Sequence, residues 1–447
     1  MFQKVLIANR GEIAVRIIQA CRDLGIISVA VYSEADREAL HAQIADEAVC
    51  IGPARAADSY LNMDNIISAA LASGCQAIHP GFGFLSENPD FAERITQAGL
   101  AFIGPTAATI RLMGDKSEAK RNAIAAGVPV ALGTDGPLRD FDEAISEAER
   151  IGYPVMLKAA SGGGGKGIRV AESVKDLKDA YDSATAEAIA NFGDGRLYME
   201  KYIHNPRHIE VQILGDNYGN VMHLFERECS VQRRHQKLIE ESPSAFVTPE
   251  LREKMTSAAV ALAKRVGYRN AGTIEFLVDN DRNFYFCEMN TRIQVEHPVT
   301  EEVTGVDLVC EQLRVAAGEP LSFKQEDLTI RGHAIECRIN AEDPSRNFAP
   351  CPGTLVSLHL PGGPGVRVDS AAYQGYKIPP FYDSMNGKLI VYGADREQAI
   401  VRMRRALAEM LFEGVVTATD YQMHILCSKA FVEANFNVNS IANGDFD

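Results

Sequence analysis

The sequence predicts an α/β and α+β chain of three domains, and three observations point to that class. A chain of 447 residues is too long for one ordinary hydrophobic core, so two or three domains are expected. The chain opens with a strand–helix–strand pattern at residues 4–8, 12–24 and 28–32, which is typical of a doubly wound sheet. Short strands separated by Gly and Pro turns, as at residues 353–368, predict a mixed, β-rich C-terminal domain.

Composition excludes several classes of protein. The formal net charge of −15 argues against nucleic acid or an anionic membrane as a bulk partner. The nine cysteines show no Cys-x-x-Cys spacing, which suits a reducing compartment better than a disulfide framework or a zinc site. No segment approaches the ~20 apolar residues that a membrane helix needs. We therefore expect a soluble, cytoplasmic protein.

The N-terminal domain is predicted to be Rossmann-like but without a dinucleotide. Its first turn, residues 9–12, lacks the Gly-x-Gly-x-x-Gly pattern that lets a backbone approach a pyrophosphate, and Gly25 is placed to end the first helix. The later loop HPGFGFLSEN, residues 79–88, is on its own residues more simply a structural turn.

A second domain is expected to begin after Met113, with Asp115 or Ser117 capping a helix that runs to residue 126. The glycine run at 161–167 lies between predicted strands at 154–158 and 168–170. It neither ends in Gly-Lys-Ser/Thr nor opens a helix, which disfavours a P-loop. A flap closing over phosphates and a ligand-free flexible turn both remain open from the residues alone.

The hairpin of residues 272–278 and 283–288 carries the strongest chemical signal. If Asp279 pairs with Phe284, Glu275 lies opposite Glu288, and like charges about 5 Å apart are destabilising unless a cation lies between them. Carboxylate oxygens favour magnesium, although a solvated hairpin remains the alternative. We predict that the strand continues, so that one face carries Glu288, Asn290, Arg292, Gln294 and Glu296 and the chain bends at residues 297–298.

Two further stretches bear on function. The basic run QRRHQK, residues 232–237, supplies positive charge in an acidic chain and indicates an anion site rather than a solvated face. A strand at 332–343 places Arg338 on a polar face, where an isolated arginine is usually a structural ion pair. Helices are predicted at 306–316 and, as the final one, at 396–410.

The chain resembles the biotin carboxylases of the ATP-grasp superfamily. NRGEIA, HPGFGFLSEN, MGDK, GGGGKG, MEKY, NPRHIE, QRRHQK, EMNTRIQVEHP and ECRINAED occur in family order with family-like spacing. This resemblance implies domains at 1–113, 114–330 and 331–447, the central one an ATP-grasp domain with a glycine-rich lid at about 131–203. Three residues depart from the family pattern: Phe82 for tyrosine, Asn386 for an aliphatic residue and Ala418 for asparagine.

The resemblance also implies ligands and roles. Arg292 would hold bicarbonate, Glu296 would act as general base, Arg338 would stabilise the enolate-like oxygen of biotin, and Lys237 would contact bicarbonate and phosphate. Mg²⁺ or Mn²⁺ would be held by Glu275, Glu288 and Asn290. The residues implied to bind the nucleotide or its neighbours are Lys116, Lys158, Gly164, Gly165, Glu200, Lys201, Tyr202, Ile203, His208, Gln232, His235 and Val295.

The implied reaction is ATP- and bicarbonate-dependent carboxylation of biotin via carboxyphosphate. No biotin-attachment motif and no carboxyltransferase region are evident, so the expected partners are a separate biotin carboxyl carrier protein, carboxyltransferase subunits and a second copy in a homodimer. Acetyl-CoA carboxylase, and hence fatty acid biosynthesis, is the expected context. Alternatives are a pyruvate or propionyl-CoA carboxylase, or another ATP-grasp ligase; a non-enzymatic subunit is disfavoured because every implied metal ligand and base is present.

Overall fold

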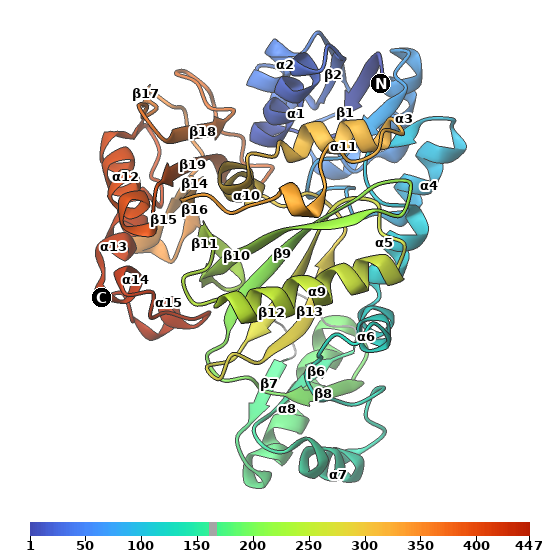
Figure 1. Ribbon diagram of the computed structural model, residues 1–447, viewed down its shortest axis with the longest axis vertical. Helices are drawn as coiled ribbons and strands as arrows, with labels where there is room; N and C mark the ends of the chain where they lie inside the picture. The colour runs from blue at the N-terminus through green and yellow to red at the C-terminus, as the bar shows by residue number, and fades with distance from the viewer. Residues whose placement is uncertain (161–167) are drawn as a thin grey trace.

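The computed structural model describes residues 1–160 and 168–447, and it confirms the expected α/β and α+β architecture (Figure 1). The N-terminal part contains a parallel sheet in the order β3-β2-β1-β4-β5. Its elements are β1 (Lys4–Ile7), α1 (Gly11–Asp23), β2 (Ile27–Tyr32), α2 (Leu40–Ile44), β3 (Glu47–Cys50), α3 (Met63–Ala72), β4 (Ala77–His79), α4 (Pro89–Gln97) and β5 (Ala101–Phe102). The predicted opening pattern is therefore confirmed, and Gly25, at φ +68°, follows the end of α1 as expected.

An eight-stranded antiparallel sheet forms the middle of the molecule, in the order β13-β12-β9-β10-β11-β14-β19-β18. Its strands are β9 (Arg207–Gly215), β10 (Val221–Arg233), β11 (Gln236–Ser242), β12 (Asn270–Val278), β13 (Phe284–Asn290), β14 (His333–Asn340), β18 (Val366–Ser370) and β19 (Met385–Gly393). Because β14, β19 and β18 continue the sheet, residues on both sides of position 330 share one hydrogen-bonded framework.

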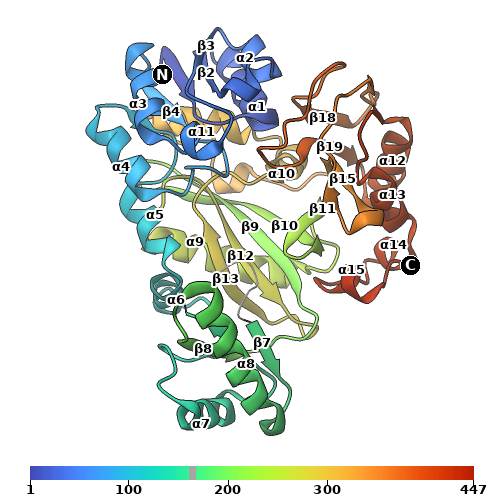
Figure 2. The same cartoon turned by 180° about the vertical axis from the view of Figure 1, so that it is seen from behind.

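The two faces of this sheet have different compositions because side chains alternate along each strand. One face of β9 and β12 supplies Ile209, Val211 and Ile274 to a core with the helix α9 (Pro249–Arg265). Figure 1 shows α9 lying across the sheet, and Figure 2 shows the sheet from its other side. That other face carries His208, Glu210 and Glu275, as the alternation of charged residues predicts.

A smaller α/β unit lies at one end of the large sheet (Figures 1 and 2). It combines the sheet β7-β6-β8 with two helices. Its elements are α7 (Phe141–Ile151), β6 (Val155–Ala159), β7 (Ile168–Ala171), α8 (Val174–Phe192) and β8 (Leu197–Lys201). The chain reaches this unit through two helices, α5 (Ala107–Gly114) and α6 (Lys116–Ala125). The Asp115 carboxylate caps α6, as expected, by accepting hydrogen bonds from two backbone N–H groups.

Three predictions about local structure are wrong. The strand through Glu288 was predicted to continue to Glu296, but it ends at Asn290. Residues 291–296 therefore do not form a strand with side chains on alternating faces, and the helix α10 (His297–Thr304) begins directly after Glu296. Val278, not Asp279, pairs with Phe284; a β-bulge between Glu275 and Phe276 then restores the Glu275–Glu288 pairing.

The third wrong prediction concerns the C-terminal end, where 396–410 is not the final helix. The helix α12 (Arg396–Glu409) is followed by α13 (Thr419–Cys427), α14 (Lys429–Val432) and α15 (Ser440–Asn443). The remaining elements are α11 (Leu308–Ala316), β15 (Glu342–Asp343), β16 (Ala349–Pro350), β17 (Ser357–His359) and β20 (Leu411–Glu413). Among the described helices, none is both long and apolar enough to cross a membrane.

Candidate active site

A buried lysine lies at the centre of the charged face of the large sheet. Lys237, on β11, donates from Nζ to Glu210 at 2.6 Å, to Glu296 at 2.6 Å and to Glu275 at 3.0 Å. Burial alone would lower the pKa of Lys237, but the three carboxylates outweigh burial and raise that pKa. The ammonium therefore stays charged, and all three of its protons are used.

A second buried cation, Arg227, shares this cluster and was not anticipated from the sequence. Its guanidinium donates to Glu210 at 2.5 Å, to Gln212 at 2.7 Å and to Thr273 at 3.0 Å. Arg227 lies between Glu226 and Glu228 on β10. Because all three residues are charged, the sequence does not indicate which of them faces the Lys237 cluster. Arg227 holds the carboxylate of Glu210 from one side while Lys237 holds it from the other.

Glu296 joins the lysine cluster to Arg338 on β14. One oxygen of Glu296 accepts from Lys237, and the other accepts from Arg338 at 3.0 Å. Arg338 also donates to Glu240 at 2.6 Å. Burial would raise the pKa of Glu296, but Lys237, Arg338 and Arg227 together hold it well below its usual range. Glu296 is thus an ionised carboxylate fixed between cations.

The facing pair Glu275 and Glu288 has the features of a divalent cation site. Burial raises the pKa of Glu288, and the charge of Glu275 raises it further, only partly offset by Lys116 at the start of α6. Glu275 accepts from Asn290 at 2.9 Å and lies 3.0 Å from the ring of His208. The buried carboxylate of Glu275, the solvent-exposed carboxylate of Glu288 and an amide oxygen make a hard, oxygen-only donor set, which fits Mg²⁺.

Arg292 is held beside this pair by a residue from the N-terminal domain. Its Nε donates to Glu87 at 2.8 Å, and its terminal nitrogens donate to Gln294 at 2.9 Å and to Asn290 at 3.1 Å. Glu87 also accepts from the backbone N–H of Thr291 at 3.1 Å. The loop at 79–88 therefore reaches the site, as the family resemblance implies although its residues alone favour a structural turn. Glu87 was not among the predicted site residues.

The residues expected to contact the nucleotide are spread over several elements. Lys158 on β6 pairs with Glu200 on β8 at 2.6 Å, whereas the ammonium of Lys201 donates to the carbonyls of Gly152 and Tyr153. Tyr202 and Ile203 follow β8 and are half-buried. Lys116 is exposed at the start of α6, and His235 is exposed in the β10–β11 turn, where Gln232 is buried opposite Lys237. Gly164 and Gly165 lie outside the described residues.

The three departures from the family pattern occupy separate places. Phe82 packs against the core beneath the first sheet, and Asn386 is buried with its side chain donating to Ser384 O at 2.8 Å. Ala418 is the N-cap residue of α13, a position where asparagine would accept from the backbone and alanine cannot. None of the three touches the cluster around Lys237.

Comparisons with known families divide the chain into three matched segments. Residues 1–110 match the biotin carboxylase N-terminal domain, and residues 336–443 match the biotin carboxylase C-terminal domain. Residues 115–324, which include β6 to β13, match the ATP-binding domain of the carbamoyl-phosphate synthase L chain.

Individual relatives are similar over most or all of their length. The chain is 56% identical over 446 residues to biotin carboxylase 1 of Bacillus subtilis, covering 100% of this chain and 99% of that protein. It is 56% identical to one of the subunits of pyruvate carboxylase from Methanothermobacter thermautotrophicus, covering 96% and 88%. The biotin carboxylase domain dimer of Hydrogenobacter thermophilus 2-oxoglutarate carboxylase, solved with MgADP, ADP and bicarbonate, superposes with a TM-score of 0.93 at 51% identity, covering 100% and 99%.

Proposed function

Because the chain belongs to the biotin carboxylase family, we propose that it carboxylates biotin on a separate carrier protein as the first half-reaction of an acetyl-CoA carboxylase. It is an ATP-dependent ligase with an ATP-grasp fold. One observation carries the proposed roles: Glu296, a base held ionised, lies between Lys237 on the phosphate side and Arg338 on the biotin side. This single carboxylate therefore contacts both halves of the site.

Each side chain has a task that follows from its contacts. Arg292 presents a planar guanidinium that matches the paired oxygens of bicarbonate, and Glu87 holds its Nε end. Lys237 offers positive charge to bicarbonate and to the γ-phosphate, and one of its three carboxylate bonds must be exchanged for a direct contact with either anion. Glu296 accepts the bicarbonate proton as the bicarbonate oxygen attacks phosphorus, which yields carboxyphosphate and ADP. Carboxyphosphate then breaks its carbon–oxygen bond to the phosphoryl group and releases CO₂ and phosphate. The ureido N–H of biotin gives its proton to that phosphate or to a basic side chain. Arg338 stabilises the enolate-like oxygen of the resulting anion, whose nitrogen attacks CO₂ to form carboxybiotin.

Magnesium, when bound, supplies charge neutralisation to the transferring phosphoryl group. Glu275, Glu288 and Asn290 are the residues that would hold it, and the raised pKa of Glu288, due to burial and then to Glu275, is consistent with a place for a cation. Manganese has the same preference for carboxylate and amide oxygens.

We assign the nucleotide to residues on α6, on the small sheet and on the neighbouring strands and turns of the large sheet. Lys116 and Lys158 are the phosphate-contacting cations in this proposal, His235 contacts the nucleotide, and residues 200–203 contact the base. His208, Gln232 and Val295 complete the set. We keep domain limits near residues 113 and 330, with a lid at about 131–203; the matched segments 1–110, 115–324 and 336–443 support them.

The partners follow from the reaction. A carrier must deliver biotin and a carboxyltransferase must receive the carboxyl group; a homodimer is supported by the dimeric relative. A cytoplasmic location is part of the same proposal. The identity of 56% to a pyruvate carboxylase subunit equals that to a biotin carboxylase, so a pyruvate carboxylase is the second candidate context.

The test follows labelled carbon through both half-reactions. The chain is incubated with Mg·ATP, ¹⁴C-bicarbonate and a biotinylated carrier, and label on the carrier is measured. Labelled carrier is then mixed with carboxyltransferase and either acetyl-CoA or pyruvate, using the subunits that co-purify with the chain. Labelled malonyl-CoA supports the proposal; labelled oxaloacetate replaces it with the second candidate, and unlabelled carrier refutes both.

A further inference from the structure

A second fully buried lysine lies on the same sheet as Lys237 but takes no part in the reaction described above. Lys388 is on β19, directly across from Arg338 on β14, and its side chain is 0% exposed. Its Nζ donates to the backbone carbonyl of Val295 at 2.7 Å. Burying an ammonium group costs free energy unless the group is well paired and hydrogen-bonded. The burial of Lys388 and its bond to a backbone carbonyl therefore call for an explanation.

The partners of Lys388 come from three parts of the chain. Besides Val295, its Nζ lies 3.4 Å from a carboxylate oxygen of Glu12 on α1, in the geometry of an ion pair rather than a hydrogen bond. Burial raises the pKa of Glu12 to about 7, against the opposing charge of Lys388. Burial also raises the pKa of nearby Glu336 well above its usual value, against the opposing charge of Lys388.

The bond to Val295 falls where the chain has left its strand. β13 ends at Asn290, so the stretch leading to Glu296 has no strand ladder to hold it. At its start, Thr291 is held by Glu87, and near its end Gln294 O lies 2.8 Å from the ring of His297. The Val295 carbonyl and the Glu296 nitrogen belong to the same planar peptide group. By binding this carbonyl, Lys388 fixes the orientation of the peptide that precedes Glu296, the proposed base.

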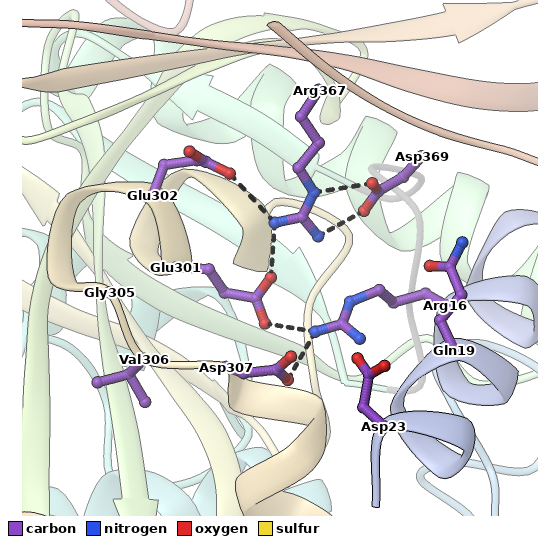
Figure 3. Close-up of a pocket in the computed structure, with 10 residues that line it drawn as sticks. All are labelled: Arg16, Gln19, Asp23, Glu301, Glu302, Gly305, Val306, Asp307, Arg367 and Asp369. Carbon is purple, nitrogen blue, oxygen red and sulfur yellow. Dashed lines mark hydrogen bonds and ion pairs between the residues drawn. The ribbon is translucent and has the colours of Figure 1, made fainter. Parts of the chain in front are cut away.

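The helix that follows Glu296 is anchored separately. On α10, Glu301 lies between two guanidinium groups, accepting from Arg16 at 3.2 Å and from Arg367 at 2.8 Å, as Figure 3 shows. These ion pairs surround a cavity of about 540 Å³ and secure the body of α10 to α1 and β18. Neither the Arg16–Glu301 bond nor the Arg367–Glu301 bond involves the Val295–Glu296 peptide, whose carbonyl accepts from Lys388 instead.

We propose that Lys388 is a positioning residue for the reaction: by fixing the Val295–Glu296 peptide it keeps the Glu296 carboxylate between Lys237 and Arg338. The inference rests on the proposed function, because it assigns to Lys388 the support of the base named there. It differs from a charge-balancing role toward Glu12, in which the bond to Val295 would be incidental.

Two single variants and their combination separate these roles. Lys388→Met keeps the length of the side chain and removes the donor, but it leaves Glu12 without its cation. Glu12→Gln keeps the Lys388–Val295 bond. The double variant removes the donor without leaving an unbalanced Glu12 carboxylate. Each is compared with the parent by kcat and KM for ATP and bicarbonate, by binding of an ATP analogue and by melting temperature.

We expect Lys388→Met and the double variant to lose kcat by roughly 10²-fold, the order of loss for about 1 Å misplacement of a reacting group, with KM for ATP close to the parent value. Glu12→Gln keeps the parent kcat, and the double variant melts at a higher temperature than Lys388→Met. A parent-like kcat in Lys388→Met or in the double variant overturns the inference. If the parent itself forms no carboxybiotin, the proposed function fails instead.

Discussion

Two carboxylates of the proposed active site, Glu296 and Glu288, have their charges balanced in different ways. At the biotin end, Glu296 is paired with both Lys237 and Arg338, so the protein supplies its counterions. At the phosphate end, Glu288 faces Glu275, and within residues 1–160 and 168–447 it forms no ion pair at 4 Å or less. The protein itself supplies the counterions of Glu296 and of Glu275, whereas in our proposal Glu288 gains its counterion from a bound cation.

This difference predicts different consequences for similar substitutions. Breaking a buried ion pair leaves an uncompensated charge, which costs about 3–5 kcal/mol. Neutralising a carboxylate that faces another carboxylate relieves repulsion in the free protein and becomes unfavourable only when the cation must bind. The same Glu→Gln change should therefore affect chemistry at one end and ligand affinity at the other.

The largest effect is expected at the biotin end. Glu296→Gln keeps the shape of the side chain but removes the base, so carboxylation should fall by ~10²–10⁴, the usual contribution of a positioned acid–base group. Mg·ATP affinity should stay near that of the parent because Glu275 and Glu288 are untouched. Steady-state turnover and equilibrium nucleotide binding measure the two quantities. A variant that turns over at the parent rate would mean that Glu296 is not the base.

A smaller effect of another kind is expected at the phosphate end. Glu288→Gln should weaken Mg·ATP binding by at least about tenfold, since even outer-shell metal partners contribute 10–100-fold. Thermal stability without ligand should be equal to or greater than that of the parent, because the repulsion with Glu275 is removed. Titration with an ATP analogue at several Mg²⁺ concentrations is the measurement. Normal Mg·ATP affinity in this variant would contradict the shared-cation interpretation of the hairpin.

The smallest effect should come from Glu240, the second carboxylate on Arg338. Burial raises its pKa to about 7, so at neutral pH it is partly protonated, and glutamine still offers an oxygen to the Arg338 Nε that now donates at 2.6 Å. Glu240→Gln should raise KM for biotin by less than about tenfold, since a neutral acceptor replaces a partly charged one. Bicarbonate-dependent ATP cleavage should not change. A loss as large as that of Glu296→Gln would show that Glu240 acts in the chemistry itself.

The sequence predicts the strands of this site better than its loops. Glu210 and Glu275 lie on one face of the sheet, opposite the apolar side chains that pack on α9, and the alternation of polar and apolar residues along β9 and β12 is a local signal for this. The departure of the chain after Asn290 depends on tertiary contacts with Glu87 and Lys388, which no local pattern encodes.

The missed residues have the same physical explanation. Arg227 lies in a run of alternating charges, and only the burial of its strand between β9 and β11 selects it as the inward-pointing cation. The bulge after Glu275 offset a turn that was predicted one residue out of register, so the pairing of Glu275 with Glu288 was correct although the turn was not.

The central claim is that ATP cleavage is coupled to bicarbonate and biotin, and one measurement tests it most directly. ADP formation is followed in carbonate-stripped buffer with Mg²⁺, then with bicarbonate, then with bicarbonate and free biotin. We predict little ADP without bicarbonate, more with it, and a further rise with biotin, which remains modest because untethered biotin lacks the effective concentration of a carrier-bound one. Equal ADP formation with and without bicarbonate would contradict the account.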